Sequence, residues 1–199
     1  MKPIFLQTTP HTGTNTAVYL FQHLGGIPVF FIHFGDWEMS EFLDKIHGYR
    51  EQFVWLHTAR PRQDVLASYK KRMPEYSRDA EHPNSAENLL ARNWAVEEKW
   101  HREFSEAFVL PIGVDVTLQT DVAKLVFKAC GAEVPDTAKR FLETWPAYGT
   151  FPTGEPGDTR GWDSEEEMMA MRDVMRGYRV LPKNRGEDKL NEFIQGLSN

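Results

Sequence analysis

The sequence has little of what would assign it to several large classes of protein. It contains one cysteine, Cys130, among 199 residues, which excludes an intramolecular disulfide and a cysteine-based zinc site. No apolar run approaches the roughly 20 residues of a membrane-spanning helix, and the residues after Met1 do not resemble a signal peptide. The net charge of −6 argues against a general nucleic-acid binder. We therefore expect a cytoplasmic protein with no nucleic-acid or membrane partner.

Four short apolar runs predict the strands of a sheet. They lie at residues 4–7, 28–33, 52–57 and 107–112. The runs are continuous rather than alternating, which is typical of strands that are covered on both faces. Because helical patterns separate them, the sequence predicts an α/β fold in three layers. Its centre is a parallel sheet of about four to five strands, flanked by helices.

The helical patterns suggest one domain over residues 1–199, with an α/β core at 1–115 and a mainly helical part at 116–199. Helices are predicted at 17–24, 62–72, 85–104, 120–130, 137–144, 164–176 and 188–197. Ser85 is a suitable N-cap for the longest of them. The segment 148–161, rich in glycine and proline, is predicted to be a loop.

The turn after the first predicted strand, from Thr8 to Thr16, is the most informative segment of the chain. A strand that turns through Gly13, Thr14 and Asn15 into a helix presents backbone N–H groups and the positive end of the helix dipole. This arrangement favours a bound phosphate or sulfate. The turn lacks the Gly-Lys-Ser/Thr ending of a nucleotide-hydrolysing P-loop, and with it the lysine and hydroxyl that hold phosphates and magnesium.

A second polar segment follows the third predicted strand. Arg60 stands at the carboxyl end of that strand, where open α/β sheets bind their ligands. Its guanidinium offers a planar fork of donors to an anionic oxygen. Ser68, about two helical turns further on, supplies a hydroxyl to the same anion. Asp64 either orients Arg60 or caps the start of the helix.

With these two segments the chain resembles the sulfotransferases that use 3′-phosphoadenosine-5′-phosphosulfate (PAPS) as donor. In that family a loop of the form Thr-x-Pro-Lys-Ser-Gly-Thr-Thr holds the 5′-phosphosulfate. The matching positions here are Thr8, Pro10, Gly13 and Thr14, with Thr12 in place of Ser. A second family segment holds the 3′-phosphate through its Arg and Ser. The matching positions here are Arg60, Pro61, Asp64, Val65 and Ser68.

The resemblance implies a P-loop NTPase-like fold, PAPS as donor substrate and PAP as product. It implies that the first loop binds the donor through Thr12, Gly13, Thr14, Asn15 and Thr16, and that Arg60 and Ser68 bind the 3′-phosphate. The segment 154–158 fits the centre of a late glycine loop of the family. That match implies that Arg160, Gly161 and Trp162 close over the 3′-phosphate and adenine.

The resemblance also suggests the catalytic groups. His11 replaces the family's loop lysine, and a protonated imidazole donates a comparable hydrogen bond to the leaving oxygen. His33, at the end of the second strand, is our candidate base, with Asp36 behind it. No metal is expected, because a sulfuryl group carries less charge than a phosphoryl group. The acceptor is a small molecule, a saccharide or a protein with a hydroxyl or amine.

Two other functions stay open at this point. The first is a nucleotide kinase, which the missing Gly-Lys-Ser/Thr disfavours. The second is a non-catalytic protein that binds PAP or a nucleotide and keeps the fold, which the exchange of lysine for His11 favours. A histidine at a strand end, such as His33, is more often structural than catalytic. His57, in the third strand, is predicted to be a core residue with its hydrogen bonds satisfied.

Overall fold

A parallel β-sheet forms the centre of the computed structural model, with the strand order β4–β3–β1–β2–β5. The structure describes residues 1–9, 12–33, 48–72, 85–112, 115–144, 184–185 and 195–196. The four main strands are β1 (Ile4–Thr8), β2 (Val29–His33), β3 (Val54–Ala59) and β4 (Phe108–Pro111). The two residues of β5 (Asn184–Arg185) pair with β2. Every pairing is parallel, so the predicted α/β class and parallel sheet are confirmed.

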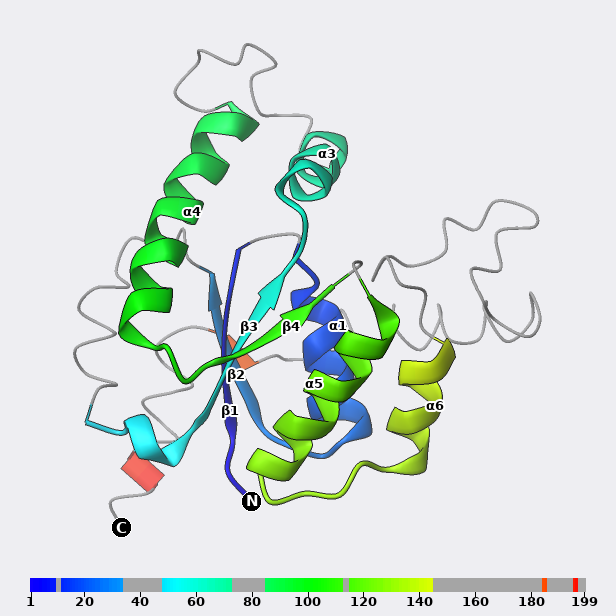
Figure 1. Cartoon of the computed structure of the whole chain (residues 1–199). Coiled ribbons are helices and arrows are strands. Elements are labelled where there is room, and N and C mark those ends of the chain that lie inside the picture. Colours follow the sequence, from blue (N-terminus) through cyan, green and yellow to red (C-terminus); the bar gives the residue numbers. More distant parts are fainter. Residues whose placement is uncertain are drawn as a thin grey trace.

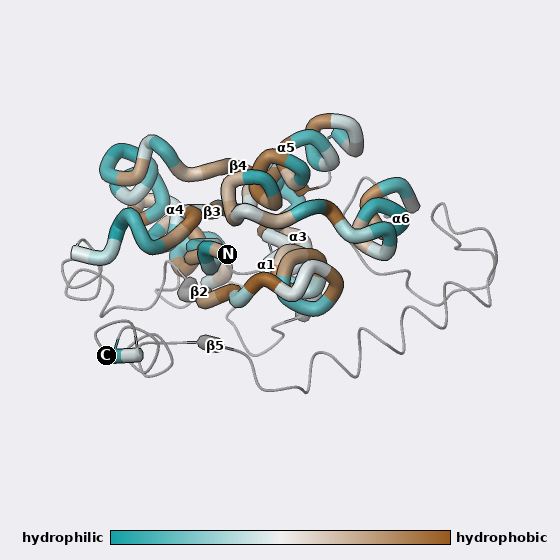
Figure 2. Tube along the Cα trace, turned by 90° about the horizontal axis from the view of Figure 1, so that it is seen from below, coloured by the Kyte–Doolittle hydropathy of each residue, from teal (hydrophilic) through white to brown (hydrophobic). Residues whose placement is uncertain are grey.

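Helices cover both faces of this sheet, as Figure 1 shows. One face packs against α1 (Thr14–Val18), its π-helical continuation η1 (Tyr19–Leu24), α5 (Val116–Ala129) and α6 (Asp136–Thr144). The other face packs against α4 (Ala86–Glu103). Apolar and hydrophilic residues alternate along α5 and α6 in Figure 2, as in helices that bury one face.

Alternate residues of β1 enter the two cores. Ile4 and Leu6 belong to the cluster on the side of α1 and α5. Phe5 belongs to the aromatic cluster on the side of α4, where its ring lies 5.0 Å from that of Trp55. Because successive side chains of a strand point to opposite faces, burial on both sides explains the unbroken apolar runs in the sequence.

Capping residues set the starts of the two longest helices. Ser85 accepts a hydrogen bond from the Asn88 N–H at 3.2 Å, as predicted for the N-cap of α4. Helix α5 starts at Val116, four residues before the prediction, because Asp115 caps it by accepting from the N–H groups of Thr117 and Leu118. Helix α3 (Arg62–Arg72) has its predicted bounds.

Two further elements start two or more residues away from the prediction. The first helix begins at Thr14, three residues early, and β3 begins at Val54 because a 3₁₀ turn, η2 (Arg50–Gln52), precedes it. The predicted loop 148–161 and helix 164–176, and most of the predicted helix 188–197, lie outside the described residues. None of the helices in the described ranges combines the length and apolar character that a bilayer crossing requires.

The strand order places a topological switch point between β1 and β3. The chain moves from β1 to β2 on one side, and then crosses to β3 and β4 on the other side of β1. In open parallel sheets, ligands bind outside the carboxyl ends of the strands where the order reverses in this way. The turn after Thr8 and the turn after Ala59 both lie at this position.

Candidate functional site

Four threonine hydroxyls join the ends of β1 and β3 to the loop between them and α1. Thr8 Oγ1 lies 2.6 Å from Thr58 Oγ1, 2.5 Å from Thr12 Oγ1 and 3.2 Å from Thr14 Oγ1. Thr12 Oγ1 also lies 2.9 Å from Thr58 Oγ1. Because each hydroxyl both donates and accepts, this threonine cluster (Thr8, Thr12, Thr14 and Thr58) satisfies buried polar groups without a charge.

The threonine cluster holds the backbone of the loop in one shape. Thr12 donates twice to the Thr9 carbonyl, through its hydroxyl at 2.7 Å and its N–H at 3.3 Å. Gly13 follows with φ +99°, and a Cβ there would lie 2.9 Å from Ile112 Cγ1. The Ala17 N–H then donates to the Gly13 carbonyl at 3.0 Å, which starts the helix. Only glycine fits this position without strain or displacement of Ile112.

The second polar segment, from Arg60 to Ser68, leaves the sheet beside this loop. Thr58 is a buried member of the threonine cluster, and the partly buried Arg60 follows two residues later. Ser68, also partly buried, lies in α3, which Figure 1 shows beyond the carboxyl ends of the strands. After β4, the Ile112 N–H donates to the Ala59 carbonyl at 2.7 Å. Three strand ends therefore meet around Gly13.

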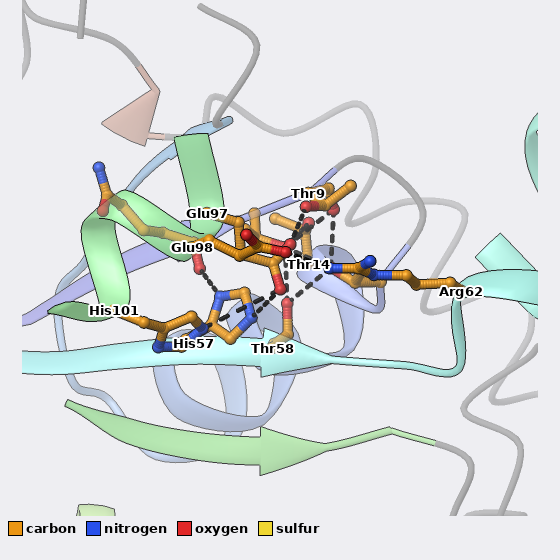
Figure 3. Close-up of polar contacts among 11 residues, drawn as sticks. Thr9, Thr14, His57, Thr58, Arg62, Glu97, Glu98 and His101 are labelled. Atoms are coloured by element: carbon orange, nitrogen blue, oxygen red, sulfur yellow. Dashed lines mark hydrogen bonds and ion pairs between the residues drawn. The ribbon is translucent and has the colours of Figure 1, made fainter. Parts of the chain in front are cut away.

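Glu97 of α4 connects the loop to a pair of histidines, as Figure 3 shows. One carboxylate oxygen, Oε2, accepts a hydrogen bond from the Thr9 hydroxyl at 2.5 Å. The other, Oε1, lies 3.2 Å from His57 Nε2 and 4.0 Å from His101 Nε2. His57 is fully buried, and its Nδ1 lies 3.0 Å from the Gln7 carbonyl oxygen.

The surroundings shift the pKa values of two of these groups. Burial raises the pKa of Glu97, but the close contact with His57, the hydrogen bond from Thr9 and the charges of both histidines outweigh it, so the pKa lies below its usual value. The pKa of His101 is lowered, first by burial and then by the charge of His57, against the opposing effect of Glu97. Glu97 is thus held as a carboxylate and His101 as a neutral imidazole near pH 7.

The structure brings several predicted site residues to one edge of the sheet. Thr12, Gly13 and Thr14 lie beside the end of β3, which leads to Arg60. The register of the sheet also pairs Thr8 with His33, so the backbone of His33 lies at the same edge. Thr16 is buried in the first turn of α1, and the backbone of Asn15 lies in the same turn. The predicted residues that fall outside the described ranges are His11, Asp36, Arg160, Gly161 and Trp162.

The sequence analysis did not identify Thr9, Thr58 and Glu97 as part of this region. For Glu97 a signal was present. Asn93, Glu97 and Trp100 follow the i, i+4, i+7 spacing of one helix face, and Asn93 and Trp100 are buried. A carboxylate on the buried face of a helix needs a partner in the interior. For Thr58 there was no local signal, because threonine is common in strands.

Comparisons with known proteins assign the chain to no family: no family model, curated protein or solved structure matches it.

Proposed function

We propose that the protein is a PAPS-dependent sulfotransferase, which moves a sulfuryl group from PAPS to a hydroxyl or amine of an acceptor. One observation carries the proposal. The two segments that match the sulfotransferase motifs, residues 8–16 and 60–68, lie together at the switch point between β1 and β3. Thr12 of the first segment contacts Thr58, two residues before Arg60, with their hydroxyl oxygens 2.9 Å apart. Segments suited to the two anionic ends of one adenosine compound therefore share one edge of the sheet. This convergence, with the glycine turn from β1 into α1, also supports a P-loop NTPase-like fold.

The proposed donor site uses backbone and side-chain donors for different phosphates. The N–H groups from Gly13 into the first turn of α1 face the 5′-phosphosulfate at the positive end of a helical run that continues to Leu24. Arg60 and Ser68 bind the 3′-phosphate, and Arg160, Gly161 and Trp162 close over it and the adenine. Thr12 has a positioning role, because both its hydroxyl and its N–H bond within the loop.

In the proposed reaction the acceptor oxygen attacks the sulfur atom, and the bond from sulfur to the 5′-phosphate oxygen breaks, so that PAP leaves. His33 takes the proton of the acceptor hydroxyl, with Asp36 behind it. A protonated His11 donates a hydrogen bond to the leaving phosphate oxygen, where negative charge grows. The position of the His33 backbone beside Thr8 supports this arrangement. The roles of His11 and Asp36 come from the sequence.

Thermal unfolding with and without PAP tests the proposal. PAP at a hundred times its dissociation constant stabilises the native state by about 2.7 kcal/mol, or roughly 5–10 °C in Tm for a domain of this size. Arg60→Ala is expected to remove most of that shift and to leave the ligand-free Tm close to that of the wild type. Arg102→Ala, at an exposed arginine in the last turn of α4, is the matched control and keeps the shift.

The other two functions give different results in the same assay. A shift with ATP and magnesium but none with PAP contradicts the proposal and indicates a kinase. A PAP shift without transfer of labelled sulfate from PAPS to any of a panel of acceptors indicates a non-catalytic binder. A PAP shift that survives Arg60→Ala unchanged contradicts the assignment of the 3′-phosphate site.

A further inference from the structure

The contact between His57 and Glu97 contains an electrostatic conflict. His57 Nδ1 lies 3.0 Å from the Gln7 carbonyl oxygen, which only accepts hydrogen bonds, so Nδ1 carries the proton. In neutral imidazole the lone pair is then on Nε2, which lies 3.2 Å from a carboxylate oxygen of Glu97. Two acceptors this close repel each other unless a cation stands between them. That cation is either a proton or a metal ion.

The position of His101 favours a metal ion over a proton. Its Nε2 lies 4.0 Å from the same oxygen, Glu97 Oε1, too far for a hydrogen bond. A proton between His57 and Glu97 therefore leaves His101 without a bond to Glu97, although the imidazole rings of His57 and His101 pack edge to face with 4.5 Å between their centroids. A metal ion next to Oε1 has room to bind all three groups, because the three ligand atoms lie within 4.8 Å of one another.

We propose that His57 Nε2, Glu97 Oε1 and His101 Nε2 form a binding site for a divalent transition-metal ion of the zinc class. Ligands held about 2.1 Å from a tetrahedral ion lie about 3.4 Å apart. The observed separations from Glu97 Oε1 are 3.2 Å and 4.0 Å, and all three ligand atoms lie within 4.8 Å of one another. Binding therefore requires His101, whose side chain is 34% exposed, to move toward the other two ligands.

The donor set and its surroundings suit such an ion. Two imidazoles and one carboxylate are a typical zinc set, whereas magnesium and calcium prefer oxygen ligands alone. Glu97 and His101 are separated by one helical turn, so both project from one side of α4. The hydrogen bond from His57 Nδ1 to a backbone carbonyl is the outer contact that metal-binding histidines usually make.

The proposed metal site is connected to the loop after β1. The Thr9 hydroxyl donates to Glu97 Oε2, so Glu97 binds the ion through Oε1 alone and the loop through its other oxygen. The ion would fix α4 against β3 and the loop, and no step of sulfuryl transfer passes through it. The inference does not depend on the proposed function, although it revises our expectation of a protein without metal.

Titration of the full-length protein with zinc, after treatment with a chelator, tests the site. Calorimetry is expected to show one bound ion per chain, and cobalt(II) in its place is expected to give the visible absorption of a site with nitrogen and oxygen ligands. His101→Ala and Glu97→Gln change partly exposed residues and are expected to preserve the fold. We expect each to weaken zinc binding roughly a hundredfold or more, since even outer contacts contribute about 10–100-fold.

The matched control is His23→Ala, which removes an exposed histidine of η1 that stacks on Tyr19. It is expected to bind zinc as the wild type does. Equal affinity in the wild type and His101→Ala would overturn the proposal, because the ion would then be bound elsewhere. Absence of zinc binding at micromolar concentrations would also overturn it, and would assign the His57–Glu97 contact to a proton.

Discussion

Thr58→Val tests whether the threonine cluster holds the two motif segments together. Valine keeps the shape of threonine but removes a hydroxyl that lies 2.6 Å from Thr8 Oγ1 and 2.9 Å from Thr12 Oγ1. A hydroxyl has one proton, and those of Thr8 and Thr12 go to the Thr9 carbonyl, so Thr58 donates to only one of them, a hydrogen bond of about 0.5–1.5 kcal/mol. In Thr58→Val, Thr8 and Thr12 still donate to the Thr9 carbonyl. No donor is left unsatisfied, so we expect a loss of about 1 kcal/mol.

Thr8→Val provides an internal comparison. Its hydroxyl contacts three other threonine hydroxyls and donates to the Thr9 carbonyl at 3.0 Å. We therefore expect a larger loss than for Thr58→Val, by about 1 kcal/mol. Urea unfolding measures both as changes in midpoint at constant slope. Thr137→Val, at an exposed position of α6, is the control and should change the free energy of unfolding by less than about 0.5 kcal/mol.

Two results would refute this reasoning. If Thr58→Val matched Thr137→Val within error, the hydroxyls of the threonine cluster would contribute nothing to stability, and the segments would be held by packing alone. If Thr58→Val were more destabilising than Thr8→Val, Thr8 would not be the centre of the cluster.

Two further predictions concern the loop and the cysteine. Gly13→Ala is expected to destabilise the protein by about 1–3 kcal/mol in urea unfolding, because alanine at φ +99° is strained and its Cβ would lie 2.9 Å from Ile112 Cγ1. In a double-mutant cycle with Ile112→Ala, which removes both Cγ atoms near that Cβ, only the part of the loss due to the contact should be recovered, and full recovery would show that the backbone angle costs nothing. Burial raises the pKa of the Cys130 thiol to about 11 from 9.0, so at pH 8 it should react with iodoacetamide at least about a hundredfold more slowly than the same thiol in urea. Equal rates in the folded and unfolded protein would contradict the buried position of Cys130.

The sheet was predictable because its signal is local. The runs around Leu6 and Phe31 are apolar without alternation, and this occurs where a strand is buried on both faces. The start of α5 was missed for an equally local reason, since Asp115 is a strong N-cap but the prediction followed the apolar periodicity further along the helix. For these elements the sequence contained the information that was needed.

The contacts of the candidate site are not local. Thr8 and Thr58 are fifty residues apart, and Thr9 and Glu97 are separated by 88. Nothing near Thr58 in the sequence marks its hydroxyl as a partner of Thr8, because the register of β1 with β3 decides it. His57 was predicted to be a core residue with satisfied hydrogen bonds, and the structure buries it fully. Its contact with Glu97 depends on how α4 packs on the sheet. The spacing of residues within β3 or within α4 does not predict that packing.

The threonines of this loop could have two roles, shaping the backbone of the loop and binding an anion, and a match to the sequence motif does not distinguish them. Thr8 and Thr58 are fully buried and Thr12 is 3% exposed, and their hydroxyls contact one another beneath the loop. In the proposed donor site the N–H groups from Gly13 onward bind the anion, and they are useful only if the backbone is already fixed. The threonine cluster fixes that backbone from the side of β3, and Glu97 fixes it from the side of α4 through Thr9. Whatever neutralises Glu97, a proton or a metal ion, therefore acts on the loop through Thr9.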